Sequence, residues 1–232
     1  MSKRNPNEMR TFTKQELDQI LDKHKLWLSS NGEEGERADL RCADLRYANL
    51  RCADLSYADL RHADLHSADL SYANLSSADL HYANLSSADL HYANLSYANL
   101  HYADLNYANL YYADLSYANL KYANLRYANL SCTSLNSADL SSADLNNADL
   151  DFSAFPLWCG GLNVHIDDKI ATQLLYHLVY NVKLSPHTSK QLKSLCNMKS
   201  ILKQANKFHR VDECGSIEQI EQINFTDTLL KK

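Results

Sequence analysis

The sequence predicts a solenoid of short extended segments, flanked on both sides by α-helical segments. Three observations predict it: a period of five residues through the middle of the chain, an amphipathic segment before it, and an abrupt change of composition after it. The 232 residues include only 5 Gly and 3 Pro but 15 Tyr, a balance that argues against a flexible linker or a collagen. The length suffices for one large domain or two small ones.

The repeated unit is Ala, then Asp or Asn, then Leu, then two variable residues, in 24 consecutive pentads over residues 38–157. A five-residue period fits neither a helix nor the alternation of a long strand, so the chain must turn once per pentad. Ala and Leu lie two positions apart and therefore point to the same side of an extended segment. We expect Ala and Leu to face inward and Asp or Asn to face outward.

This tandem A(D/N)LXX pattern resembles the pentapeptide repeat family over residues 38–157, about half the chain. The resemblance implies an all-β solenoid: a right-handed quadrilateral β-helix with one pentad per side, of about six coils. With four pentads per coil, residues 20 apart stack in columns. The predicted domains are an N-terminal capping helix and linker (1–37), the β-helix (38–157) and a small C-terminal α-helical domain (158–232).

Reading the columns gives a candidate interaction surface. One side of the predicted coil carries a basic and aromatic strip, made of Arg41, Arg61, His81, His101, Lys121, Tyr82, Tyr102 and Tyr122. Another side carries a tyrosine column, made of Tyr72, Tyr92 and Tyr112. Such tyrosine ladders either form a recognition surface or merely stabilise neighbouring coils. His81 and His101 should stack about 5 Å apart. Without Cys or an acid in ligand geometry, no metal site is predicted.

The resemblance also implies a second possible activity, because quinolone-resistance members of the family are understood to mimic duplex DNA and bind type II topoisomerases. Residues 38–157 contain 14 Asp against five Arg and one Lys, a net charge of −8. A duplex mimic about 29 Å long needs on the order of 17 negative charges. The repeats also run without an inserted loop. A DNA-mimic inhibitor of DNA gyrase, or of another DNA-binding protein, is therefore the alternative and not the leading function.

Residues 11–30 predict one amphipathic helix with a capping box formed by Thr13 and Glu16. Its apolar stripe contains Leu17, Ile20, Leu21, His24 and Leu28, with Trp27 beside it. A stacked solenoid has an open lumen and unpaired edges at its ends, so this helix is predicted to cap the first coil. Partner binding is the alternative. Trp27 is the candidate capping residue at this end, and Phe155 and Trp158 are the candidates at the other end.

The C-terminal segment predicts a small helical domain. A helix begins at Asp167 or Asp168, and another begins at Ser185-Pro186. Residues 155–160 (FPLWCG) and 205–215 (ANKFHRVDECG) are similar to tails of phage and bacterial pentapeptide proteins. The apolar content exceeds what one rod end needs, so a homodimer through these helices is expected. A zinc site has suitable residue types but poor spacing: Cys159, His165, Cys196, His209 and Cys214.

Known catalytic patterns do not occur: the sequence has no Walker loop, no dinucleotide-binding Gly motif and no HExxH. We therefore expect a noncatalytic structural or interaction protein without cofactor, whose rigid repeat surface binds a protein partner. A metal or enzymatic site in the C-terminal domain is a further alternative. A net charge of −5 argues against direct nucleic-acid binding. Without a long apolar run or a secretory signal, the chain is expected to be cytoplasmic and not membrane-bound.

Overall fold

The computed structural model describes residues 9–151, 153–154, 165–184, 190–196 and 199–207. The chain divides into two compact units, residues 1–165 and 166–232. The first contains β1 (Arg10–Thr11), α1 (Lys14–Ser29) and β2 (Ala43–Asp44), followed by the repeats, and the second contains α2 (Asp168–Leu184), α3 (Lys190–Cys196) and α4 (Lys199–Ala205). The expected boundary at residue 157 and the candidate capping residues Phe155 and Trp158 lie outside the described residues.

Each pentad consists of a β-turn and a short extended segment. In the first, the Ala43 N–H donates to the Leu40 carbonyl (3.1 Å) and closes a turn around Arg41 and Cys42. Cys42 has a φ of 52°, and the equivalent residue of each pentad up to Asn147 is left-handed as well. A type II turn places such a residue at its third position, usually Gly. These repeats use Tyr, Ser, Cys, His or Asn there instead.

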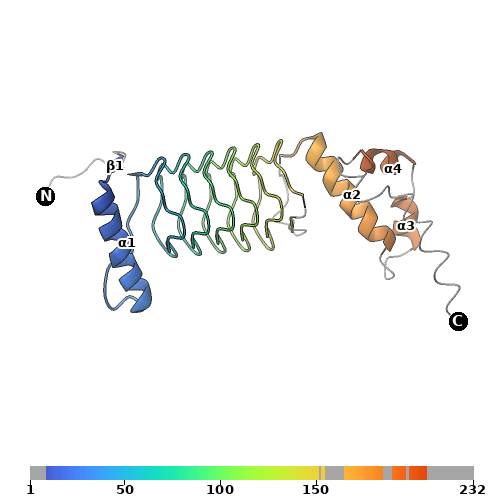
Figure 1. Cartoon of the computed structure of the whole chain (residues 1–232). Helices are drawn as coiled ribbons and strands as arrows, with labels where there is room; N and C mark the ends of the chain where they lie inside the picture. The colour runs from blue at the N-terminus through green and yellow to red at the C-terminus, as the bar shows by residue number, and fades with distance from the viewer. Residues whose placement is uncertain (1–8, 152, 155–164, 185–189, 197–198, 208–232) are drawn as a thin grey trace. The chain divides into compact units, whose positions relative to one another are not determined.

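Parallel backbone bridges join the Asp or Asn of one pentad to the residue 20 positions later, starting with Asp39 and Asp59. Four pentads therefore complete one coil, as the resemblance to pentapeptide repeats implies. One side is built by directly stacked pentads that carry Asp39, Asp59, Asp79, Asn99, Asn119 and Asp139. Figure 1 shows the coils of the first unit stacked one upon the next, beginning beside α1 (blue). The backbone of His165 adds one more bridge, to Asp144.

The interior consists of leucine and alanine. The central Leu residues from Leu40 to Leu150 are buried, and so are nearly all Ala residues two positions before them. The predicted inward orientation is confirmed. Each buried Leu contributes about 1.5–3 kcal/mol gross. Thr133 replaces Ala in one pentad and is also buried, and its hydroxyl donates to the Leu110 carbonyl (2.7 Å), so the buried polar atom is satisfied.

The Asp and Asn side chains have a structural role that the sequence analysis missed. The Asp39 Oδ1 accepts the backbone N–H of Arg41, two residues later (3.2 Å), and the same contact recurs in most later pentads, for example between Asn94 and Ser96 (3.0 Å). This is an Asx turn, in which a short polar side chain fixes the entry to a backbone turn. Asp and Asn both form this bond from an outward position, which accounts for their interchange along the repeats.

The N-terminal segment begins with an element that the sequence did not predict. Strand β1 pairs in parallel with β2, with Arg10 opposite Ala43, and so extends one side of the first coil. Helix α1 follows and has the predicted capping box: the Thr13 hydroxyl accepts the Glu16 N–H (3.2 Å), and the Thr13 N–H donates to the Glu16 carboxylate (2.8 Å).

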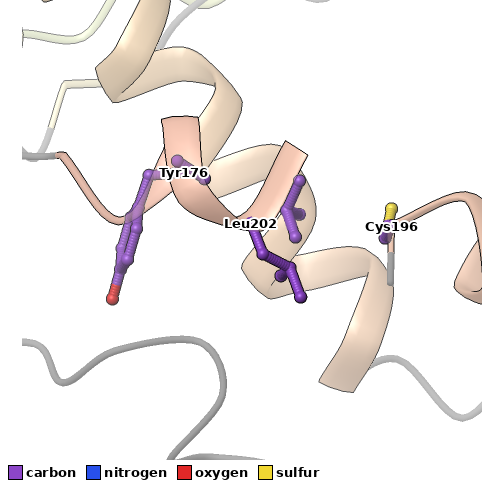
Figure 2. Close-up of a cluster of buried hydrophobic side chains, with 5 residues drawn as sticks. Tyr176, Cys196 and Leu202 are labelled. Carbon is purple, nitrogen blue, oxygen red and sulfur yellow. The ribbon is translucent and has the colours of Figure 1, made fainter. Parts of the chain in front are cut away.

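The second unit packs α3 and α4 against α2 (Figure 1). Its core is a small apolar cluster, drawn in Figure 2: Tyr176, Val179, Cys196, Leu202 and Ala205. The predicted helix start is confirmed, because α2 begins at Asp168 and the Asp167 carboxylate accepts the Ile170 N–H (2.9 Å). The later helical segment consists of two helices. The expected start at Ser185-Pro186 lies outside the described residues.

Candidate interaction surface

Stacked aromatic rings cover the outside of the repeats. Tyr72, Tyr92 and Tyr112 stack on one side with centroids 5.2 and 5.1 Å apart and rings within 3° of parallel. On the first side the stacked rings are those of His62, Tyr82, Tyr102 and Tyr122, with successive centroids at 5.1, 5.0 and 4.8 Å. The two other sides each carry a stacked pair, Tyr97 with Tyr117 and Tyr107 with Tyr127. All these tyrosines are exposed.

The N-terminal half of the expected basic strip is neutralised by carboxylates. The Arg41 guanidinium binds Asp39 (2.7 Å) and approaches Asp59 (3.5 Å), and Arg61 repeats this with Asp59 (2.6 Å) and Asp79 (3.5 Å). The hydrogen bond from Arg41 lowers the pKa of Asp39 to about 2. Each guanidinium thus lies between two stacked carboxylates, which it keeps from repelling one another.

The C-terminal half of the strip differs, because Asn99 and Asn119 stand in the column where Asp39, Asp59 and Asp79 stand earlier. Lys121 forms no ion pair with any residue that the structure describes, and its Nζ lies 5.3 Å from the Tyr122 ring centroid. We define the His–Tyr patch as this part of the surface, made of six side chains: His81, His101, Lys121, Tyr82, Tyr102 and Tyr122.

The two histidines of the His–Tyr patch form a hydrogen-bonded pair. Their rings stack with centroids 4.9 Å apart, and the two Nδ1 atoms are 3.2 Å apart. One Nδ1 must donate while the other accepts, so a proton on both would break the bond. Burial and then the positive charges of His81 and Lys121 lower the pKa of His101. The predicted separation of about 5 Å agrees with this geometry, whereas the hydrogen bond was not foreseen.

Outside this strip, asparagine separates carboxylates that would otherwise stack. The Asn84 amide donates to Asp64 (2.9 Å), and Asn124 donates to Asp104 (2.9 Å), each across one coil. Where Asp89 follows Asp69 directly, the His91 Nδ1 lies 2.7 Å from the Asp89 carboxylate. Many of the rod's carboxylates are therefore bonded within the rod. This arrangement differs from the free, evenly spaced charges of a DNA backbone.

The described residues contain no group of three His, Cys, Asp or Glu side chains that could hold a metal ion. Of the five residues considered for zinc, His165 lies in the first unit and Cys196 is buried in the core of the second. Cys159, His209 and Cys214 lie outside the described residues. No helix in the described ranges has the length and apolar character needed to cross a membrane.

The first coil lacks a preceding coil, and side chains bind some of its backbone carbonyls instead. The Arg10 guanidinium donates to the Asp39 carbonyl (3.0 Å), and Arg37 donates to the Tyr57 carbonyl (2.5 Å). His24 of α1 contacts the Ser56 carbonyl (3.1 Å). In the sequence, His24 is recognisable only as a member of an apolar stripe. Trp27, the expected capping residue, is half-buried and stacks on His24 (5.7 Å).

The chain turns once per pentad, each pentad forms one side of a coil, and residues 20 positions apart stack on one another. These features define a β-solenoid of pentapeptides. The family described as Pentapeptide repeats matches this chain in 8 copies, over residues 36–56, 48–86, 83–121 and 118–151, which together make up half of the sequence. The protein belongs to the pentapeptide repeat family, whose members fold as right-handed quadrilateral β-helices.

Several solved structures of pentapeptide repeat proteins resemble this chain. HetL from the cyanobacterium Nostoc sp. strain PCC 7120, involved in heterocyst differentiation regulation, is 28% identical over 55% of this chain and 80% of its own, with a TM-score of 0.23. Rfr23 from the cyanobacterium Cyanothece 51142 is 35% identical over 50% and 65%, with a TM-score of 0.28. QnrB1, a plasmid-mediated fluoroquinolone resistance protein, is 22% identical over 64% and 75%, with a TM-score of 0.40. No curated protein matches the sequence.

Proposed function

We propose that the repeat region is a noncatalytic interaction module whose His–Tyr patch binds a protein partner. The observation that carries this proposal is the exposed stack of Tyr82, Tyr102 and Tyr122 beside a lysine without an ion pair among the described residues. Aromatic rings with polar tips offer a large contact area, and rings held by their neighbours lose little freedom on binding. Lys121 adds a positive charge at the edge of the stack, which favours an acidic contact on the partner.

The experiment must separate recognition from stabilisation of the coils, because stacked rings do both. Serine occupies the same left-handed turn position at Ser67 and Ser87 (φ 54° and 58°), so the triple change of Tyr82, Tyr102 and Tyr122 to Ser is compatible with the fold. The double change of Tyr97 and Tyr117 to Ser removes a stack on another side and is the matched control.

Wild type and both variants are used to capture proteins from the native host, with melting temperatures measured in parallel. We expect a partner that wild type and the Tyr97/Tyr117 control retain and the patch variant loses. Retention of that partner by the patch variant would refute the proposed site. Equal loss by both variants, together with equally lowered melting temperatures, would assign the rings to stability alone.

We also propose that α1 caps a rod of six coils. The pairings on one side link six successive residues from Asp39 to Asp139, and α1 contacts the first coil through His24. Phe155 and Trp158 remain proposed as capping residues at the other end. Deletion of residues 1–37 should expose unpaired strand edges and cause self-association, measured by light scattering. A deletion variant that stays monomeric and equally stable would contradict the capping role.

The second candidate function is DNA mimicry toward gyrase, and the net charge of −8 over residues 38–157 favours it. The internal bonding of many carboxylates and the charge deficit count against it. A gyrase supercoiling assay separates the two functions. We expect no inhibition by the protein at tens of micromolar, and inhibition at that concentration would favour the mimic.

A homodimer through the C-terminal helices is a further proposal. Leu178 on α2 is 57% exposed, while Val179 beside it is buried in the cluster of Figure 2. An exposed leucine on a short helical unit suits a two-fold contact between copies. Light scattering of wild type and of Leu178→Glu should give a dimer and a monomer, respectively. A monomeric wild-type chain would refute the dimer.

A further inference from the structure

His24 is the one histidine among the described residues that is completely buried, and it joins α1 to two separate parts of the chain. Its Nδ1 lies 3.1 Å from the backbone nitrogen of Ala38, where the chain enters the first coil. Its Nε2 lies 3.1 Å from the carbonyl oxygen of Ser56, on the last side of that coil. One imidazole therefore binds both the start and the last side of the first coil, and so joins α1 to the repeats.

These two contacts determine the protonation state of the ring. The Ala38 backbone nitrogen carries a hydrogen and can only donate, so the His24 Nδ1 must accept and carries no proton. The Ser56 carbonyl can only accept, so the Nε2 must carry the proton and donate. The docked ring is the neutral Nε2–H tautomer with both nitrogens satisfied. A proton on Nδ1 would place two N–H groups head to head at 3.1 Å.

The surroundings favour the same state. Burial is the main cause that lowers the pKa of His24 below its usual value of 6.5, and the positive charge of Arg37 acts in the same direction. The Ser56 carbonyl and the Asp54 carboxylate of the first coil oppose this shift. Asp54 and Arg37 are the charged groups that face the ring. Trp27 of α1 covers one face of the imidazole, with rings 13° from parallel.

We propose that His24 is a proton-sensitive latch, which holds α1 on the first coil while the imidazole is neutral and releases α1 when the imidazole gains a proton. The added proton opposes the contact between the Nδ1 and the Ala38 N–H. Release then also separates the Nε2 from the Ser56 carbonyl and uncovers the part of the first coil's edge that β1 does not pair with. The inference rests on the contacts of α1 and not on the proposed partner surface.

The direction of the pH dependence follows from linkage. The docked state binds fewer protons than the released state, because docking lowers the pKa of His24. Docking is therefore strongest above pH 6.5, and it weakens about tenfold per pH unit below that value until the docked ring itself titrates. The latch stays closed at neutral pH and loosens in mildly acidic conditions.

Hydrogen exchange of the amides in α1, expressed as protection relative to the unfolded chain, tests the latch on the full-length protein between pH 7.5 and 5. Wild type should lose α1 protection progressively below pH 6.5, by at most about tenfold per unit, while amides of the central coils keep theirs. His24→Gln retains a donor and an acceptor without titrating, and should abolish the pH dependence. His101→Gln is the matched control and should leave it unchanged.

Constant α1 protection in wild type across this range would overturn the proposal, as would an unchanged pH dependence in His24→Gln. If His24→Gln fails to dock α1 at any pH, the imidazole nitrogen resonances of His24 in the wild-type protein decide instead. We expect the neutral Nε2–H form as long as α1 is protected, and protonation together with loss of that protection. A protonated His24 in a fully protected α1 would refute the latch.

Discussion

Truncation of one central leucine tests the packing of the rod. Leu110 is fully buried, and Leu90 and Leu130 occupy the same column one coil before and one coil after it. Leu110→Ala removes three buried carbon atoms, worth about 2.4 kcal/mol at about 0.8 kcal/mol for each. The cavity left between two rigid coils adds to this loss, so we expect the free energy of unfolding to fall by about 3 kcal/mol. Urea unfolding followed by circular dichroism measures it.

The matched control changes an outward residue of a nearby pentad. The Asn94 Oδ1 accepts the Ser96 N–H (3.0 Å), and an aspartate oxygen can accept the same bond. Asn94→Asp keeps this bond but places a second carboxylate beside Asp114 in the same column, so we expect the free energy of unfolding to fall by no more than about 1 kcal/mol. Leu110→Asp places an unpaired charge among leucines and should collapse the rod. A native spectrum and an unchanged melting temperature for Leu110→Asp would refute the inward assignment of the leucines.

Three other predictions concern the turns, the ion pairs and α1. Tyr47 is 72% exposed with a φ of 59°, so Tyr47→Asn, which suits a left-handed backbone, should leave the melting temperature equal or higher; a clear decrease would contradict this. The pKa of Asp39 is lowered from 3.8 to about 2, so its bond to Arg41 stabilises the fold above pH 3.8 and is lost as pH falls toward 2. Because Asp39 is half-exposed, Asp39→Asn should cost about 1 kcal/mol at pH 5, and this difference should vanish near pH 2 in paired urea titrations. Gly35 has a φ of 75° and a Cβ there would overlap the Lys23 carbonyl, so Gly35→Ala should lower the protection of α1 in hydrogen exchange; unchanged protection would contradict the tight packing.

The repeats could be predicted from the sequence because the same pattern, nearly always Ala and Leu two positions apart, recurs along 24 consecutive pentads. A five-residue period with Ala and Leu two apart determines which side chains face inward. The resemblance to pentapeptide repeats implied four sides per coil, and the 20-residue stacking follows from that number. The stacking of His81 on His101 at 4.9 Å is a consequence of that arithmetic. The left-handed turn residues could not be predicted, because a positive φ is usually indicated by glycine and these positions hold mostly Tyr and Ser.

The N-terminal contacts could not be predicted because each of them occurs once. Arg10 binds the Asp39 carbonyl across 29 residues, and His24 binds Ser56 across 32, with no repetition to reveal either pairing. A histidine on an apolar stripe is usually a packed core residue, so the spacing of His24 gave no reason to expect two backbone partners. In the second unit the apolar spacing predicted helices but not the break between α3 and α4.

The central claim, that a protein partner binds the His–Tyr patch, is tested most directly by photo-crosslinking at single positions. A benzophenone amino acid replaces Tyr102 in one protein and Tyr117 in another. Both residues have an exposed, stacked ring and a left-handed backbone conformation, but they lie on different sides of the coil. Illumination in the native host followed by mass spectrometry identifies what each position contacts. We predict one crosslinked protein at position 102 and none at position 117. Equal crosslinking at both positions, or crosslinking at 117 alone, would contradict it.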